Sequence, residues 1–297
     1  MHIPDGFLTP PVWLTLDAIS VSTIGWVAHR AGRPDPQAAS DPGRIPLLGV
    51  MGAFVFAAQM INFPVGLGAS GHLLGGSLLA IVLGPAAAAL VLTAVLILQA
   101  LLFQDGGVLV LGANVFNMAL AGVAFGYLPT RLWGRGTVPV FLGGALSVLA
   151  SSALVLWQLS LSGVAITGRP LWIAIALFSI TAVLEGIITV GAIGAIERLT
   201  PQSLRTQTYI SFPARAVFAT VALLLVTGGV WIASAAPDGL QHLASGIGLE
   251  ARPAWSHAPL AGYEFEGLGL DWLGRPAAGL VGLAFVYAVC SLGGKKH

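Results

Sequence analysis

Two of the six histidines, His2 and His72, stand in the least regular parts of an otherwise apolar chain, and together they could bind a metal ion. A histidine in second position, behind a free amine, is a chelator. The α-amino nitrogen, the main-chain nitrogen of residue 2 and its imidazole can all reach one ion once the main-chain nitrogen has lost its proton. The two chelate rings share that nitrogen, so the three donors lie nearly in one plane.

One further neutral imidazole would complete a square of four nitrogen donors, and His72 is the candidate for the fourth corner. Planar nitrogen sets suit Ni(II) and Cu(II), whereas zinc prefers a tetrahedron. Two plainer interpretations stay open. A histidine in a glycine-rich loop often makes only a local hydrogen bond, and His2 is an untied terminus unless something fixes it.

The chelate requires an unblocked amine at Met1. The opening residues MHIPDGFLTP contain no lysine or arginine and no apolar run, so they lack the basic region with which a cleavable signal peptide begins. A bulky histidine in second position also disfavours removal of the initiator methionine. We therefore expect the mature chain to begin at Met1.

The composition indicates a polytopic helical membrane protein. Of the 297 residues, 56% are hydrophobic and 8% are charged, whereas soluble domains carry about 25% charged residues. The apolar runs are long and unbroken, which favours helices over the short alternating segments of a β-barrel. The net charge of +1 indicates no strongly charged partner such as a nucleic acid, and the single Cys290 excludes an internal disulfide and a cysteine-based zinc cluster.

Nine apolar segments predict membrane helices. They cover approximately residues 12–30, 45–62, 72–83, 85–104, 112–132, 138–162, 171–197, 214–234 and 276–292. The third is short, because the Gly-Pro pair at 84–85 should break a longer run. The glycine-rich stretch FPVGLGASGHLLGG before it indicates irregular backbone at membrane depth, which is tolerated only when it is buried in protein or lines a cavity.

Lysine and arginine predict the orientation, because cytoplasmic segments are enriched in them. With the N-terminus outside, the inner segments hold ten of these residues and the outer segments hold three, Arg169, Arg252 and Arg275. The nine spans therefore predict an outer N-terminus and an inner C-terminus, with the bilayer of the cell (inner) membrane around the chain.

Two modules are expected, at residues 1–205 and 206–297. The first contains seven helices with short outer loops. The second, which we call the appendage, contains two helices joined by a long outer loop at about 235–275. The loop histidines, His242 and His257, are expected to be solvated. We predict that the appendage modulates transport without holding the ion.

Several motifs carry a resemblance to a known family. They are MHIPDGFL, INFPVGLGASGHLLGG, LLFQDGGVLVLGANVFNMALAG and LEGIITV. Over roughly residues 1–200 they resemble the substrate-binding membrane subunit of cobalt and nickel energy-coupling-factor (ECF) transporters, the CbiM/NikM family. The resemblance implies metal ligation by the Met1 amine, by the main-chain and imidazole nitrogen atoms of His2, and by His72.

The later stretch SAAPDGLQHLA, with the loop and helix after it, resembles the NikN-type PDGLE module, here fused to the first module. Gln241 stands where that motif usually has an acidic residue, which puts a charge-dependent role of this position in doubt. MHIPDG with a PDGL-type module resembles the nickel branch of the family, and the square of nitrogen atoms favours the same metal. We therefore expect Ni(II) as the transported substrate, with Co(II) as the alternative.

The expected function is that of the substrate-specific (S) component of an ATP-driven metal importer. The chain has no G-x-x-x-x-G-K-[ST] phosphate loop, and the resemblance implies two kinds of partner, a transmembrane coupling (T) subunit and ABC ATPase subunits. An intramembrane metalloprotease would need a cluster such as H-E-x-x-H, which this sequence lacks, so no enzyme activity is expected. A passive channel or sensor without an ATPase remains an alternative.

Five polar residues are further candidates. Asn62, Asn114 and Asn117 could orient the imidazoles, although a helix cap explains each nearly as well. Asp17 and Glu185 lie inside predicted spans, where acidic residues mark functional sites by default. Asp17 is close enough to its helix end to meet water. Glu185 suits a hydrogen-bonded packing role or a contact relevant to coupling.

Overall fold

The computed structural model describes residues 1–31, 44–199, 211–254, 258–265 and 271–293. Within these residues, seven helical stretches are long and apolar enough to cross a membrane. They are α1 (Pro10–Ala31), α5 with its π-helical end (Pro85–Phe103), α6 to α7 (Leu111–Trp133), α8 (Thr137–Leu161), α9 (Arg169–Leu199), α10 with a 3₁₀ extension (Phe212–Trp231) and α12 (Asp271–Gly293). The chain is therefore an all-α polytopic membrane protein, as its composition predicts.

Two shorter apolar helices, α3 (Arg44–Met60) and α4 (Gly76–Leu83), account for the other two predicted segments. Helix α4 has eight residues, about 12 Å of rise, which is far less than the roughly 30 Å apolar core of a bilayer. It ends at Gly84, whose φ of 82° leads into Pro85 at the start of α5. The predicted break is thus confirmed, and α4 is a buried half-helix.

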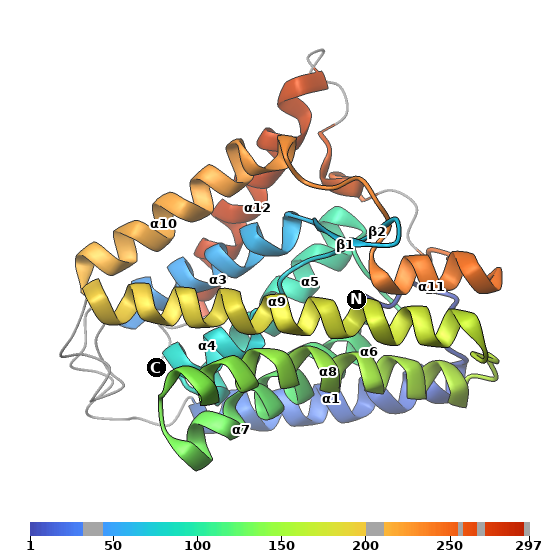
Figure 1. Ribbon diagram of the computed structural model, residues 1–297. Coiled ribbons are helices and arrows are strands. Elements are labelled where there is room, and N and C mark those ends of the chain that lie inside the picture. The colour runs from blue at the N-terminus through green and yellow to red at the C-terminus, as the bar shows by residue number, and fades with distance from the viewer. Residues whose placement is uncertain (32–43, 200–210, 255–257, 266–270, 294–297) are drawn as a thin grey trace.

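The helices form a bundle in which elements far apart in the sequence lie side by side (Figure 1). Helix α8 packs between α7 and α9, while α4 contacts α5, α7, α8 and α9 from within. Helix α3 packs against both α10 and α12. The two long helices of the appendage are therefore part of the same bundle.

The loop at 104–110 lies between two helices that contain π-helical turns. Helix α5 ends in the π-helical turn η1 (Gln99–Phe103), and the short helix α6 (Leu111–Asn114) continues into η2 (Val115–Gly122) before α7 (Val123–Trp133). π-helical turns are rare and occur frequently at functional sites. The π-helical turns on either side therefore make the loop at 104–110 a candidate functional segment.

A hairpin precedes one predicted helix, which starts later than expected. Strands β1 (Phe63–Gly66) and β2 (Ala69–Gly71) pair antiparallel, and the helix expected over 72–83 begins only at Gly76. The turn between the strands has positive φ at Gly66, Leu67 and Gly68. Glycine accepts such angles without strain, so the glycine-rich stretch forms a tight turn here.

The appendage loop contains a helix that the sequence did not indicate. Helix α11 (Gly239–Ile247) starts at a capping box, in which the Asp238 side chain accepts hydrogen bonds from main-chain N–H groups of the first turn and the Gln241 side chain accepts one from the main-chain N–H of Asp238. With nine residues, α11 is too short to be recognised in the sequence as an apolar run. Gln241 thus has a structural role that needs no charge.

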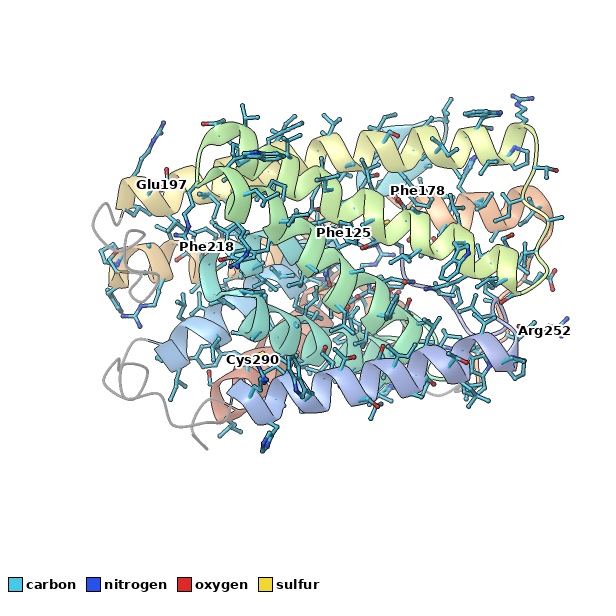
Figure 2. All side chains as sticks on the ribbon, turned by 90° about the horizontal axis from the view of Figure 1, so that it is seen from below. Phe125, Phe178, Glu197, Phe218, Arg252 and Cys290 are labelled. Carbon is cyan, nitrogen blue, oxygen red and sulfur yellow. The ribbon has the colours of Figure 1, made fainter. Side chains whose placement is uncertain are left out.

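The two ends of the bundle are distinct (Figure 2). Arg252 lies at one end, and Glu197 and Cys290 lie at the other. The main-chain N–H of Arg252 donates to the carbonyl of Asp5, so the N-terminal residues belong to the Arg252 end. Which end faces the outside stays a prediction. The predicted module boundary between residues 205 and 206 falls outside the described residues.

Candidate metal-binding site

The first eight residues, which we call the arm, are mostly buried in the bundle (Figure 1). Met1, His2 and Ile3 are 5%, 6% and 0% exposed. Phe7 and Leu8 belong to the main hydrophobic core. His2 is therefore not an untied terminus.

Asn114 fixes the main chain of the arm beside His2. Its Oδ1 accepts a hydrogen bond from the N–H of Ile3 at 2.8 Å, and its Nδ2 donates to the carbonyl of Ile3 at 3.0 Å. The same carbonyl accepts a hydrogen bond from the N–H of Gly107 at 2.9 Å. Asn114 thus orients the main chain of the arm rather than an imidazole.

Asp5 anchors the arm to two loops. Its carboxylate accepts hydrogen bonds from the main-chain N–H groups of Val108 at 3.2 Å, Leu109 at 2.9 Å and Ala254 at 3.1 Å. A Cβ atom on Gly107 would overlap the carboxylate and main chain of Asp5. A glycine at this position is therefore what allows the loop to approach the arm so closely.

The hairpin presents His72 to the arm. Gly71 packs on α9, where a Cβ atom would lie 2.7 Å from Oγ1 of Thr181. Nδ1 of His72 lies 3.0 Å from the carbonyl oxygen of Leu73. Because a carbonyl only accepts, Nδ1 carries the proton and Nε2 keeps its lone pair, which is the tautomer that an Nε2 metal ligand needs.

Glu185 of α9 supports the residues after His72. The carboxylate is 0% exposed, and its two oxygens accept hydrogen bonds from the N–H groups of Leu74 at 2.7 Å and Gly75 at 2.8 Å. The carbonyl of Leu74 accepts a further bond from Gln59 at 2.8 Å. Of the two interpretations of Glu185, the structure shows the hydrogen-bonded packing role.

The arm and the hairpin meet at the two histidines. The amine nitrogen of Met1 lies 2.9 Å from Nε2 of His72, although the two residues are 71 positions apart. The ring centroids of His2 and His72 are 5.3 Å apart, and the rings are inclined by 72°. The structure therefore brings together the three residues that the sequence singled out.

The imidazole of His2 has one loose contact. Its Nδ1 lies 3.2 Å from the carbonyl oxygen of Asp105 and 3.4 Å from Oδ1 of the same residue. Its Nε2 is buried and has no hydrogen-bond partner among the described residues. A buried unpaired polar group costs about 1–3 kcal/mol, and Nε2 of His2 is such a group, whereas both ring nitrogen atoms of His72 have a partner.

The appendage places a carboxylate at the site, which the sequence did not indicate. Oδ2 of Asp238 lies 2.5 Å from the amine of Met1 and 3.9 Å from Nε2 of His72. Asp238 is 8% exposed. The appendage is thus in direct contact with the candidate ligands.

Tyr263 of the appendage reaches the other side of the site. Its hydroxyl donates to Oδ2 of Asp105 at 2.5 Å and accepts a hydrogen bond from Nε2 of Gln99 at 3.2 Å. The same Nε2 donates to Gln59 at 2.9 Å, and Gln59 in turn supports the residues after His72. A row of hydrogen bonds therefore links the two histidine-bearing segments.

Burial and charge set the protonation of the site. Burial, followed by the positive Met1 amine and His2, lowers the pKa of His72 from 6.5 to about 4. Burial alone would raise the pKa of Asp238, but the amine and His72 outweigh it and lower the pKa to about 2. Burial would also raise the pKa of Asp105, but the two histidines lower it, and the pKa of Asp105 is lowered overall. The site therefore combines a neutral His72 with two ionised carboxylates.

The candidate donors include main-chain atoms. In the described part of the chain, no group of three or more His, Cys, Asp and Glu side chains is placed to hold a metal ion. The arrangement offers instead an amine at Met1, a main-chain nitrogen at His2 and two imidazoles. Such a set binds an ion as a tridentate chelate with one additional ligand.

A family model described as "Cobalt uptake substrate-specific transmembrane region", CbiM, matches residues 2–203. The match covers more than half of the chain. The chain belongs to the CbiM family. This CbiM-family protein is therefore a multi-pass membrane component of metal transport and not an enzyme.

Relatives of the CbiM-family chain include proteins named for nickel and for cobalt. The putative fused nickel transport protein NikMN of Archaeoglobus fulgidus is 30% identical, over 97% of this chain and 96% of that protein. The cobalt transport protein CbiM of Acetoanaerobium sticklandii is 35% identical, over 54% of this chain and 67% of that protein. A crystal structure of a transition metal transporter is 28% identical with a TM-score of 0.58, and the match covers 69% of this chain and 96% of that one.

Two predicted asparagines lie elsewhere in this CbiM-family protein. Asn117 exchanges two hydrogen bonds with Gln158, at 2.8 and 2.6 Å. Asn62 accepts a bond at its main-chain carbonyl from the N–H of Ser234 at 2.8 Å. The hydrogen bonds found in the described residues join neither asparagine to an imidazole.

Asp17 also has a structural contact. Its Oδ1 accepts a hydrogen bond from the N–H of Gly112 at 2.7 Å, and Ser20 donates to the carbonyl of the same glycine at 2.7 Å. Both polar main-chain groups of Gly112 are thus satisfied by α1. This contact fixes the start of the helix that carries Asn114.

The histidines of the appendage loop do not reach the site in the described residues. His242 is a half-buried residue on α11, and its main-chain N–H donates to the carbonyl of Asp238 at 2.7 Å. His257 lies outside the described residues. The prediction that these side chains are solvated therefore stays a prediction.

One sequence signal could have found Asp105 and Asp238. The chain contains three Asp-Gly pairs, at residues 5–6, 105–106 and 238–239. Asp-Gly pairs mark turns. In this CbiM-family protein all three turns converge on the site, where Asp5 anchors the arm and the other two aspartates contact His2 and Met1.

Proposed function

We propose that this protein captures Ni(II) in a planar site of four nitrogen atoms and delivers it inward as the substrate-specific component of an ATP-driven importer. The four donors are the Met1 amine, the main-chain nitrogen of His2, Nδ1 of His2 and Nε2 of His72. The amine and the two nitrogen atoms of His2 form the chelate, and His72 occupies the corner opposite the main-chain nitrogen.

The distance between the Met1 amine and Nε2 of His72 carries this proposal. Metal–nitrogen bonds of about 2.0–2.1 Å, the length found for imidazole on zinc, place neighbouring corners of a square about 2.8–3.0 Å apart. The amine and Nε2 are 2.9 Å apart. This pair therefore already has the spacing of two adjacent corners, and Nε2 carries the lone pair that a ligand needs.

Completing the square requires a movement of His2. Only Nδ1 can close a six-membered ring with the main-chain nitrogen of the same residue, because Nε2 is too far along the ring. Nδ1 faces Asp105 in the structure. Capture therefore exchanges the contact with Asp105 for a bond to the ion: the side chain rotates, and the proton that Nδ1 donates to the carbonyl of Asp105 moves to Nε2.

Capture leaves the charge of the site unchanged. The amine and the main-chain N–H of His2 each lose one proton, and the ion brings two positive charges. His72 contributes no proton, because its pKa of about 4 keeps it neutral. We expect about two protons to be released per Ni(II) near neutral pH. Calorimetry in buffers of different ionisation enthalpy measures this number, and release of fewer than one proton contradicts a deprotonated main-chain ligand.

Substitution of His72 tests the site itself. His72→Ala should weaken Ni(II) binding by at least roughly 100-fold, the upper end of what a supporting residue contributes, because water replaces a ligand. The measurement is titration calorimetry on the purified full chain in detergent. His242→Ala is the matched control, because His242 lies on α11 nearby and should bind like the unchanged protein. Equal affinities for both variants contradict the proposed square.

The metal is a separate question within the proposal. Planar nitrogen donors favour Ni(II), whereas the family description and one of the relatives name cobalt. Paired titrations of one preparation with Ni(II) and Co(II) compare the two ions directly. Tighter binding of Co(II) would assign the protein to cobalt and leave the four donors in place.

The proposed partners are a transmembrane coupling subunit and ABC ATPase subunits. A chelate with a deprotonated main-chain nitrogen binds tightly, so release requires the site to be distorted, and ATP hydrolysis by partner subunits supplies that work. Affinity purification of the tagged chain from its source cells identifies such partners. Metal uptake into vesicles that contain this chain alone would favour a passive channel.

A further inference from the structure

The two oxygen atoms of Asp238 have separate contacts. Oδ1 accepts hydrogen bonds from the N–H groups of Leu240 at 2.9 Å and Gln241 at 2.8 Å, which caps α11. Oδ2 lies 2.5 Å from the amine of Met1. One carboxylate thus starts a helix of the appendage and holds the first candidate ligand of the arm.

The position of Asp238 is fixed from both sides. Before it, the main chain runs along β2, where Ser70 donates its N–H to the carbonyl of Pro237 at 2.8 Å and its hydroxyl to that of Ala236 at 2.7 Å. After it, the carbonyl of Asp238 accepts a hydrogen bond from the main-chain N–H of His242 in the first turn of α11, at 2.7 Å. Since β2 also leads directly to His72, the carboxylate and this imidazole are held by the same strand.

We propose that Asp238 is a positioning residue of the metal site, whose carboxylate holds the Met1 amine at the corner beside His72 before and after the ion binds. This inference rests on the proposed function. A primary amine bound to a metal ion retains two N–H groups, and these are stronger donors than those of a free amine. One of these N–H groups can therefore still donate to Oδ2 of Asp238 when the ion is bound.

The carboxylate acts from outside the square. Its 2.5 Å contact is a hydrogen-bond distance to the amine nitrogen. Oxygen atoms that accept hydrogen bonds from metal ligands orient those ligands, and their removal typically lowers metal affinity by about 10–100-fold. The burial of Asp238 strengthens this effect, because a buried charge is weakly screened. The appendage therefore contributes to affinity without supplying a ligand.

Substitutions of Asp238 can separate its two contacts. Asparagine and serine are good helix N-caps, so Asp238→Asn and Asp238→Ser keep the start of α11 while removing the charged oxygen at the amine. Gln241→Ala is the matched control, because it removes the other half of the capping box and leaves the carboxylate in place. All three are made in the full chain, and thermal unfolding checks that each folds.

The measured quantities are the affinity for Ni(II) and the visible absorption band of the nickel complex. We expect both Asp238 variants to bind about 10–100-fold more weakly, with the band unchanged in position, and Gln241→Ala to bind like the unchanged protein. Unchanged affinity of both Asp238 variants overturns the inference. So does an equal loss in Gln241→Ala, which would trace the effect to α11. A shifted band also overturns it, because Asp238 would then be a ligand.

His72→Ala, measured alongside, separates this inference from the proposed function. If His72→Ala loses affinity and the Asp238 variants do not, only the role of Asp238 fails. If His72→Ala binds like the unchanged protein, the proposed metal site fails with it.

Discussion

The two histidines of the site are held in different ways. His72 follows a hairpin that packs on α9, and its Nδ1 donates a hydrogen bond to the carbonyl of Leu73. The main-chain N–H groups of Leu74 and Gly75 donate hydrogen bonds to Glu185. His2 has one contact with Asp105, at 3.2 Å or more, and its Nε2 is unpaired among the described residues. Both ring nitrogen atoms of His72 therefore have a partner, whereas the arm is anchored through its main chain and the His2 ring has a partner at Nδ1 alone.

This difference bears on how a metal ion could enter a tight chelate. A site with every donor fixed would admit an ion slowly, and a site with none fixed would lose conformational entropy on binding. Here the hairpin half has the geometry of a ligand from the start. In the proposed capture, the side chain of His2 is the part that moves, because its Nδ1 exchanges Asp105 for the ion. Substitutions in each half of the site test this contrast between His72 and His2.

Blocking the Met1 amine should have the largest effect. Acetylation removes the basic lone pair and opens the chelate, so we expect no measurable binding of Ni(II) by calorimetry. A second variant carries one alanine added before Met1, which moves the histidine to the third position of the chain. The amine, two main-chain nitrogen atoms and the imidazole then fill all four corners. This extended chain should bind Ni(II) equally well with and without His72→Ala, and normal uptake by the acetylated protein would refute the amine as a ligand.

Glu185→Gln should have an intermediate effect on the hairpin half. Glutamine can accept only one of the two N–H bonds, and the buried group left unpaired costs about 1–3 kcal/mol of the free energy of unfolding. The loop that carries His72 should shift, with a loss of Ni(II) affinity of about 10–100-fold. Asp17→Asn is the control, because it changes another intramembrane acid that accepts a main-chain N–H away from the histidines. Destabilisation of both variants without any loss of affinity would show that the loop is held by other contacts.

Asp105→Asn should have the smallest effect. Nδ1 of His2 leaves Asp105 when it binds the ion, and the main-chain carbonyl of residue 105 is unaltered. Asparagine also keeps an oxygen that can accept the hydroxyl of Tyr263. We expect affinity within about 10-fold of the unchanged protein, at or below the lower limit for a supporting carboxylate. A loss as large as that of Glu185→Gln would mean that the arm half is as firmly held as the hairpin half.

Much of the fold follows from the sequence, because membrane helices are defined by local apolar runs. Each of the nine predicted segments contains a helix, and the Gly84–Pro85 pair separates α4 from α5 as expected. The hairpin and α11 were missed for a physical reason. Each is shorter than a span and is stabilised by turn and capping residues rather than by hydrophobic length.

The site was predictable in part. His2 and His72 could be paired because the chemistry of a second-position histidine demands another nitrogen donor. Asp-Gly pairs place Asp105 and Asp238 in turns, but nothing local shows that these turns contact His2 and Met1, which lie 103 and 237 positions away. Asn117 illustrates the opposite error. A polar residue at the right depth suggested a role near the imidazoles, yet it is paired with Gln158 on a neighbouring helix.

Helix α9 carries three supports of the site on one face. Phe178 packs against Gly239 at the start of α11, Thr181 packs against Gly71 of the hairpin, and Glu185 bonds the loop after His72. Spacings of three and four residues align these side chains along one stripe of a helix. The same rigid helix has 31 residues and extends to Glu197 at the opposite end of the bundle (Figure 2). One helix thus connects the hairpin, the loop after His72 and the start of α11, and a tilt of α9 would displace all three supports together.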